Sequence, residues 1–150
     1  MFAFLSIALL ATLAVAIVGW FRPEPAKPPT APRYTDQQIA DAKAKVCSTY
    51  EQVRKAVVAN TSRNGGDDPT ATLAVAANAR TALYDGGEYL SKTLAQQPAT
   101  PHELVKAIQT LVDSYQQLAI GYMAEVPDSD LQSSRDAVTN AGTAVYGLCK

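Results

Sequence analysis

Residues 100–122 read TPHELVKAIQTLVDSYQQLAIGY and carry the clearest helical pattern in this chain of 150 residues. Apolar residues recur every three or four positions, which is the spacing of the buried stripe of an α-helix. They are Leu104, Val105, Ile108, Leu111, Val112, Tyr115, Leu118, Ala119 and Tyr122. Thr100 and Glu103, with Pro101 between them, have the spacing of a capping box. We therefore expect an amphipathic helix that begins directly after Thr100.

Similar segments lie on both sides of this one. Toward the N-terminus, Thr35 and Gln38 form another capping box. The apolar stripe that follows it consists of Ile39, Val46, Tyr50, Val53 and Val57. Toward the C-terminus, Pro127 with Asp128 or Ser129 is expected to start a last helix. Its apolar positions are Leu131, Val138, Ala141, Ala144, Val145 and Leu148.

One more helix is predicted between these segments, with Asp68 as its cap and Pro69 as its first residue. Its stripe consists of Leu73, Ala76, Ala77, Arg80, Leu83, Tyr84, Leu90 and Leu94. Gly86 and Gly87 interrupt this helix, and each costs about 1 kcal/mol relative to alanine in a helix interior. We expect either a kink at this point or the close approach of a neighbouring backbone.

Four helices joined by short connections favour antiparallel neighbours. No run of alternating apolar and polar residues demands a strand. We predict an all-α fold in which residues 34–150 form an up-down-up-down four-helix bundle. In that topology the end of the last helix lies beside the first helix, which brings Cys149 toward Cys47.

Cys47 and Cys149 are the only cysteines, and no CxxC motif or Cys/His cluster gives them redox or metal chemistry. A disulfide that closes a loop of about 100 residues contributes about 4.7 kcal/mol in the chain-entropy model. Such bonds persist in oxidising compartments. We expect this bond and an extracytoplasmic bundle, and the alternative is two buried free thiols in a reduced domain.

Residues 1–21, MFAFLSIALLATLAVAIVGWF, contain no charged side chain. About 20 apolar residues in a helix cross a hydrocarbon core roughly 30 Å thick, so we predict a transmembrane anchor. Trp20 and Phe21, followed by Arg22, are typical of the membrane–water interface. The alternative is a cleaved signal peptide, because residues 14–16 (AVA) have the form of a cleavage site.

The next segment, residues 22–33, reads RPEPAKPPTAPR and predicts a proline-rich linker. Polyproline II at about 3.1 Å per residue would give a stiff stalk of roughly 37 Å. Its cations Arg22, Lys27 and Arg33 follow the span, and the positive-inside rule taken alone would place the bundle in the cytoplasm. The disulfide argument favours the opposite side. We expect a single-pass plasma-membrane protein with its C-terminal domain outside the cytoplasm, and the orientation stays open.

The order of span, stalk and bundle resembles a known family. Residues 34–39 (YTDQQI) lead into residues 42–47 (AKAKVC), and the chain closes in residues 148–150 (LCK). In these features the chain is similar to the alanine- and proline-rich single-pass membrane proteins of mycobacteria. The resemblance implies a location in the cell envelope. It carries over no catalytic residue, because that family has no established activity.

Composition argues against several classes of function. A net charge of −1 offers nucleic acid no basic patch, and one histidine with two cysteines is too few ligands for a zinc site. We expect His102 at the surface without a catalytic partner, and Arg80 ion-paired or snorkelling beside an apolar stripe. We therefore expect no enzyme activity, no metal and no cofactor.

Every aromatic residue after residue 33 is a tyrosine. The simple interpretation places these rings at the core edges. The sharper one is a groove lined by Tyr50, Tyr84, Tyr115 and Tyr122 that accepts a lipid or a partner helix. Two functions follow: an accessory domain anchored in the lipid bilayer and bound to a larger membrane or envelope protein complex, or a module that binds a small molecule or lipid.

Overall fold

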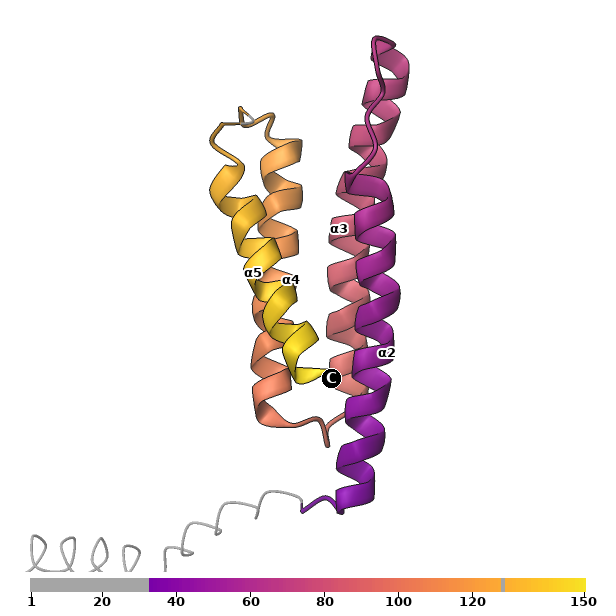
Figure 1. Ribbon diagram of the computed structural model, residues 1–150, viewed down its shortest axis with the longest axis vertical. Helices are drawn as coiled ribbons and strands as arrows, with labels where there is room; N and C mark the ends of the chain where they lie inside the picture. The colour runs from indigo at the N-terminus through magenta and orange to yellow at the C-terminus, as the bar shows by residue number, and fades with distance from the viewer. Residues whose placement is uncertain (1–32, 128) are drawn as a thin grey trace, which may run out of the picture. The chain divides into compact units, whose positions relative to one another are not determined.

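The computed structural model describes residues 33–127 and 129–150, which form four α-helices and no strand (Figure 1). The helices are α2 (Asp36–Thr61), α3 (Pro69–Gln96), α4 (His102–Met123) and α5 (Gln132–Leu148). Residues Tyr34–Lys150 make one compact unit. The predicted all-α, four-helix fold is confirmed for this part of the chain.

The predicted anchor, residues 1–21, and the predicted linker up to residue 32 lie outside the described residues. Trp20, Phe21 and Arg22 lie outside them as well. Within the described part of the chain, no helix is both long enough and apolar enough to cross a membrane. The membrane span and its stalk therefore stay predictions.

Two helix starts follow the predicted capping chemistry. At α2, the Thr35 hydroxyl accepts from the Gln38 amide at 3.2 Å, while the Gln38 side chain accepts from the Thr35 amide at 2.9 Å. At α3, the Asp68 carboxylate accepts from the Thr70 amide at 2.8 Å, and Pro69 is the first helical residue. Both predictions are confirmed, because each cap satisfies an amide that the first helical turn leaves unpaired.

The other two helix starts were predicted wrongly. Thr100 does not cap α4: its hydroxyl donates to the Gln97 carbonyl at 2.7 Å, and Pro101 precedes the helix without a side-chain cap. The last helix begins at Gln132 rather than near Ser129, and the residues before it form a turn. This turn carries Leu131 into the core, where it packs against a glycine of α4.

The core is built from the facing stripes of all four helices. α3 packs along α2 on one side and along α4 on the other, and α5 packs along α4. Consecutive helices run antiparallel (Figure 1). The largest fully buried side chains are Val46, Tyr50, Leu83, Leu90, Leu104, Ile108, Leu111 and Val145. The predicted bundle is thus confirmed.

α2 and α5 meet less closely than the other neighbouring helices. The Cys47–Cys149 disulfide joins them, with Cα atoms 5.5 Å apart, which confirms the predicted bond. The Tyr50 hydroxyl adds a hydrogen bond to the Gly142 carbonyl at 2.8 Å. The disulfide and this hydrogen bond connect α2 to α5, on the side of the bundle where the helices pack least closely.

The α2–α3 hairpin extends past the end of the α4–α5 pair (Figure 1). We call residues 58–78 the hairpin tip, and none of its side chains is buried. Leu73, for example, is 65% exposed. The predicted stripe of α3 therefore reaches the core only from Ala79 onward.

α3 continues through Gly86 and Gly87 without a break. A Cβ atom built on Gly86 would lie 2.8 Å from Cγ1 of Val53 in α2, whereas one on Gly87 would meet its neighbours at 3.7 Å. The close approach expected here is thus made by a side chain rather than by a backbone. Val53 is buried and β-branched, so it has little freedom to move away.

We expect Gly86→Ala to lower the free energy of unfolding by about 1–3 kcal/mol relative to Gly87→Ala, because it overpacks the α2–α3 contact. The matched control gains the same helix propensity, about 1 kcal/mol, without a clash. Urea unfolding of both variants measures the difference. Equal free energies of unfolding for the two variants would contradict the close contact, because α2 and α3 would then accommodate a methyl group at Val53 without cost.

Candidate functional site

The α2–α5 groove is the hollow where these two helices diverge, with a volume of about 510 Å³. Its lining residues are Tyr50, Arg54, Val57, Val58, Thr61, Tyr115, Val138, Thr139, Gly142, Thr143 and Tyr146. α2 and α5 supply the walls, and Tyr115 of α4 reaches the groove from between them. The groove exists because the shorter α5 packs on α4 and leaves one face of α2 partly uncovered.

Tyr50 forms the end of the groove nearest the disulfide. Its side chain is 1% exposed, and its hydroxyl donates to the Gly142 carbonyl. Burial raises the pKa of this phenol above 10.0. Tyr50 therefore serves mainly to link α2 to α5. Its hydroxyl hydrogen is engaged by the Gly142 carbonyl and is not available as a donor to a ligand.

Tyr115 differs from Tyr50 in one respect that matters for binding. It is 3% exposed, yet its hydroxyl makes no hydrogen bond to any described residue. Burial, followed by the nearby Tyr50, raises the pKa of Tyr115 to about 12, while Arg54 opposes the shift. The groove thus contains a protonated phenol whose hydroxyl makes no hydrogen bond to a described residue, and the oxygen of this hydroxyl is not fully buried.

Arg54 stands at the rim of the groove, one helical turn after Tyr50. Its Nη2 atom lies 2.9 Å from Oε2 of Glu51, and its Nε atom also donates to this carboxylate. The ion pair raises the pKa of Arg54 and lowers the pKa of Glu51. Because both side chains are exposed to solvent, this pair can exchange partners at low cost.

The structure brings together two of the four tyrosines predicted to line a groove. Tyr50 and Tyr115 share the α2–α5 groove, whereas Tyr84 is 45% exposed on another face. Tyr122 is half-buried near the end of α4, where its hydroxyl accepts from Arg135 at 3.3 Å. Helical spacing alone does not place four rings around one hollow.

Sequence reasoning missed Arg54 and Tyr146 as groove residues. A signal for both was present: Arg54 follows Tyr50 by four positions, and Tyr146 follows Gly142 by four. Residues four apart lie on one helical face. The missing information was which faces of α2 and α5 meet.

A second hollow of about 460 Å³ lies over α3 and α4. The apolar residues Tyr84, Ile120 and Met123 are exposed around Arg80, and we call these four residues the α3–α4 patch. The Nε atom of Arg80 is buried and has no hydrogen-bond partner within the described residues. Of the two alternatives expected for Arg80, the ion pair is absent from the described part of the chain, and snorkelling stays a prediction.

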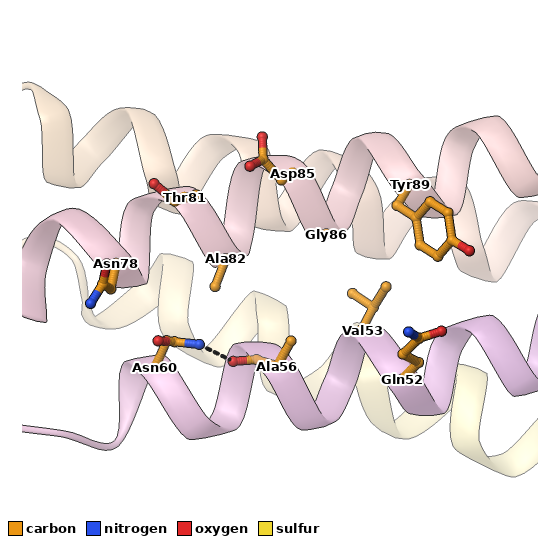
Figure 2. A pocket seen from close by; sticks show the side chains of 10 residues that line it. All are labelled: Gln52, Val53, Ala56, Asn60, Asn78, Thr81, Ala82, Asp85, Gly86 and Tyr89. Carbon is orange, nitrogen blue, oxygen red and sulfur yellow. Dashed lines mark hydrogen bonds between the residues drawn. The ribbon is translucent and has the colours of Figure 1, made fainter.

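A third hollow of about 350 Å³ follows the outer side of the α2–α3 contact (Figure 2). Val53 and Ala82 lie between the helices, and polar side chains such as Gln52 and Asn78 stand along the edges (Figure 2). The Asn60 side chain donates to the Ala56 carbonyl at 2.8 Å. This shallow hollow shows no buried polar group that lacks a partner within the described residues.

His102 is exposed in the first turn of α4. Among residues 33–127 and 129–150, no group of three or more His, Cys, Asp or Glu side chains could hold a metal ion. Comparisons with protein-family models, with curated protein sequences and with solved structures find no match to this chain.

Titration of Tyr115 should make stability depend on pH. The unfolded chain releases this proton near pH 10.0, whereas the folded protein keeps it to about 12. Its contribution is complete below pH 10.0 and is lost as the pH rises through about 12. From about pH 9 to 12, we expect the free energy of unfolding to fall by about 2 kcal/mol more in the wild type than in Tyr115→Phe.

Urea unfolding at the two pH values measures this difference. Tyr89→Phe removes an exposed phenol and is the matched control, which should behave as the wild type does. An equal fall in Tyr115→Phe and wild type would show that the Tyr115 proton is not retained on folding.

Proposed function

We propose that this chain is a membrane-anchored, extracytoplasmic accessory domain of the bacterial cell envelope, bound to a larger membrane complex and not itself catalytic. The observation that carries this proposal is the Cys47–Cys149 disulfide. Disulfides of this structural kind are rare in reducing compartments. An uncharged segment at residues 1–21 and the resemblance to mycobacterial single-pass membrane proteins support the same location.

The α3–α4 patch is the surface proposed to contact the partner protein. Exposed apolar side chains around a guanidinium are typical of interface cores, where aromatic residues, Met and Arg are enriched. Arg80 makes no ion pair with a described residue, so the outer part of its guanidinium is available to a partner carboxylate or carbonyl. Tyr84 and Met123 would lose their exposure in the same contact.

Thiol labelling of intact cells tests the location and the bond together. We expect a membrane-impermeant maleimide to label Cys47 and Cys149 only after an impermeant reductant has been added, because the thiols are paired outside the cytoplasm. A Cys47→Ser, Cys149→Ser double variant is the unlabelled control. Labelling that needs permeabilised cells but no reductant would contradict both the location and the bond.

A second function is supported by Tyr115. Its hydroxyl makes no hydrogen bond to a described residue and lies in a groove with mainly apolar walls, an arrangement typical of a site that binds a small molecule or lipid. Such sites are mostly apolar and carry few polar groups that orient the ligand. In this second proposal the bundle carries a ligand between α2 and α5.

Native mass spectrometry of the full-length protein, extracted from its own membrane, separates the two functions. The accessory role predicts a co-purifying protein that the Ile120→Ser, Met123→Ser variant loses, because the α3–α4 patch is no longer apolar. Leu73→Ser, which changes an exposed apolar residue of the hairpin tip outside the patch, is the control. A retained small lipid favours the second function, and a bare monomer contradicts both.

A further inference from the structure

We infer that the α2–α5 groove binds a single-chain carboxylic acid, with the carboxylate held by the Tyr115 hydroxyl and the Arg54 guanidinium. The apolar chain would lie along the valines of α2 and α5. This inference rests on the second proposed function and names the class of its ligand.

The groove has the size and the walls that such a ligand needs. Its volume of about 510 Å³ lies within the range of roughly 300–1,000 Å³ that small-molecule sites occupy. Val57 is buried, Val138 is partly buried, and Val58 leaves its side chain half-exposed at the rim. An apolar chain placed here would remove water from both surfaces, which is the main source of affinity in such sites.

The polar groups of the groove select the head group. The hydroxyls of Thr61, Thr139 and Thr143 donate to backbone carbonyls one turn earlier, and the Gly142 carbonyl accepts from Tyr50. The donors that remain are the Tyr115 hydroxyl and the Nη1 group of Arg54, neither of which bonds to a described residue. An acceptor group of a ligand can replace water at both donors.

The charge of Arg54 makes an anionic acceptor the better choice. A guanidinium has five N–H donors, and Glu51 uses only those at Nε and Nη2. A ligand carboxylate can therefore bind Nη1 without displacing Glu51. Hydrogen bonds to ionised groups are roughly twice as strong as neutral ones. An ammonium head group would leave both donors unpaired and would face a like charge.

Photolabelling of the full-length protein in phosphatidylcholine nanodiscs tests the inference. The probe is a twelve-carbon carboxylic acid with a mid-chain diazirine, and mass spectrometry of the labelled peptides locates the site. We expect labels on α2 and α5 around Val57 and Val138, displaced by dodecanoate but not by 1-dodecanol. Labels elsewhere, or equal displacement by the alcohol, would overturn the assignment.

Two variants test the donors. Tyr115→Phe keeps the ring in the core and removes only the hydroxyl, and Arg54→Gln removes the charge. Each should raise the dodecanoate concentration needed for half-displacement about tenfold, the usual effect of losing a hydrogen bond to a charged group. Tyr89→Phe and Lys55→Gln, which change exposed residues outside the groove, are the matched controls. Unchanged displacement in both donor variants would overturn the role of the two residues.

Further arms separate this inference from its alternatives. Nanodiscs that contain phosphatidylglycerol should label equally, and loss of labelling there would mean that the groove takes anionic phospholipid head groups instead. If native mass spectrometry finds a small lipid while dodecanoate fails to displace the probe, the ligand-binding function is supported. The inference that the ligand is a carboxylic acid is then wrong. If no ligand of any kind enters the groove, both fall together.

Discussion

The covalent bond between Cys47 and Cys149 holds the side of the bundle that helix packing leaves weakest. α5 packs along α4, while its contact with α2 depends on this bond and on the nearby hydrogen bond from Tyr50 to Gly142. A short C-terminal helix with contacts on one neighbour would fray readily. The disulfide also restricts the unfolded chain, since it closes most of the bundle sequence into one loop. The floor of the α2–α5 groove keeps its form because these two links lie at one end of it.

Much of this arrangement follows from local rules that can be applied to the sequence. The capping chemistry of Thr35 and Asp68 fixes two helix starts, because a side-chain oxygen within three residues satisfies an otherwise unpaired amide. The disulfide follows from topology, since antiparallel helices return the C-terminus to the first helix. Thr100 and the turn before α5 escaped prediction for a common reason. In each case another interaction competes with the predicted one. The Thr100 hydroxyl donates to the Gln97 carbonyl, and Leu131 packs into the core.

The candidate site was harder to foresee than the fold, because it depends on angles between helices. The pattern of α2 places Tyr50 on the buried stripe, and the pattern of α4 does the same for Tyr115. The pattern does not say that α5 tilts onto α4 and leaves a hollow where these rings meet. Tyr84 belongs to the predicted stripe of α3 yet faces outward, because this helix buries only the side that includes Leu83 and Leu90. A single aromatic residue type therefore serves the core, the groove and the surface.

The two ends of the bundle differ in local stability. We call the end with the disulfide and the buried core the firm end, and the hairpin tip the loose end. Free energies of local opening are small where few apolar side chains are buried, and residues 58–78 bury none. The α2–α5 groove crosses this boundary: Tyr50 belongs to the firm end, whereas Val58 and Thr61 belong to the tip. Local opening of the hairpin tip would therefore widen the groove near Val58 and Thr61. The end of the groove next to the disulfide would keep its structure. Molecules could enter and leave while the rest of the fold stays closed.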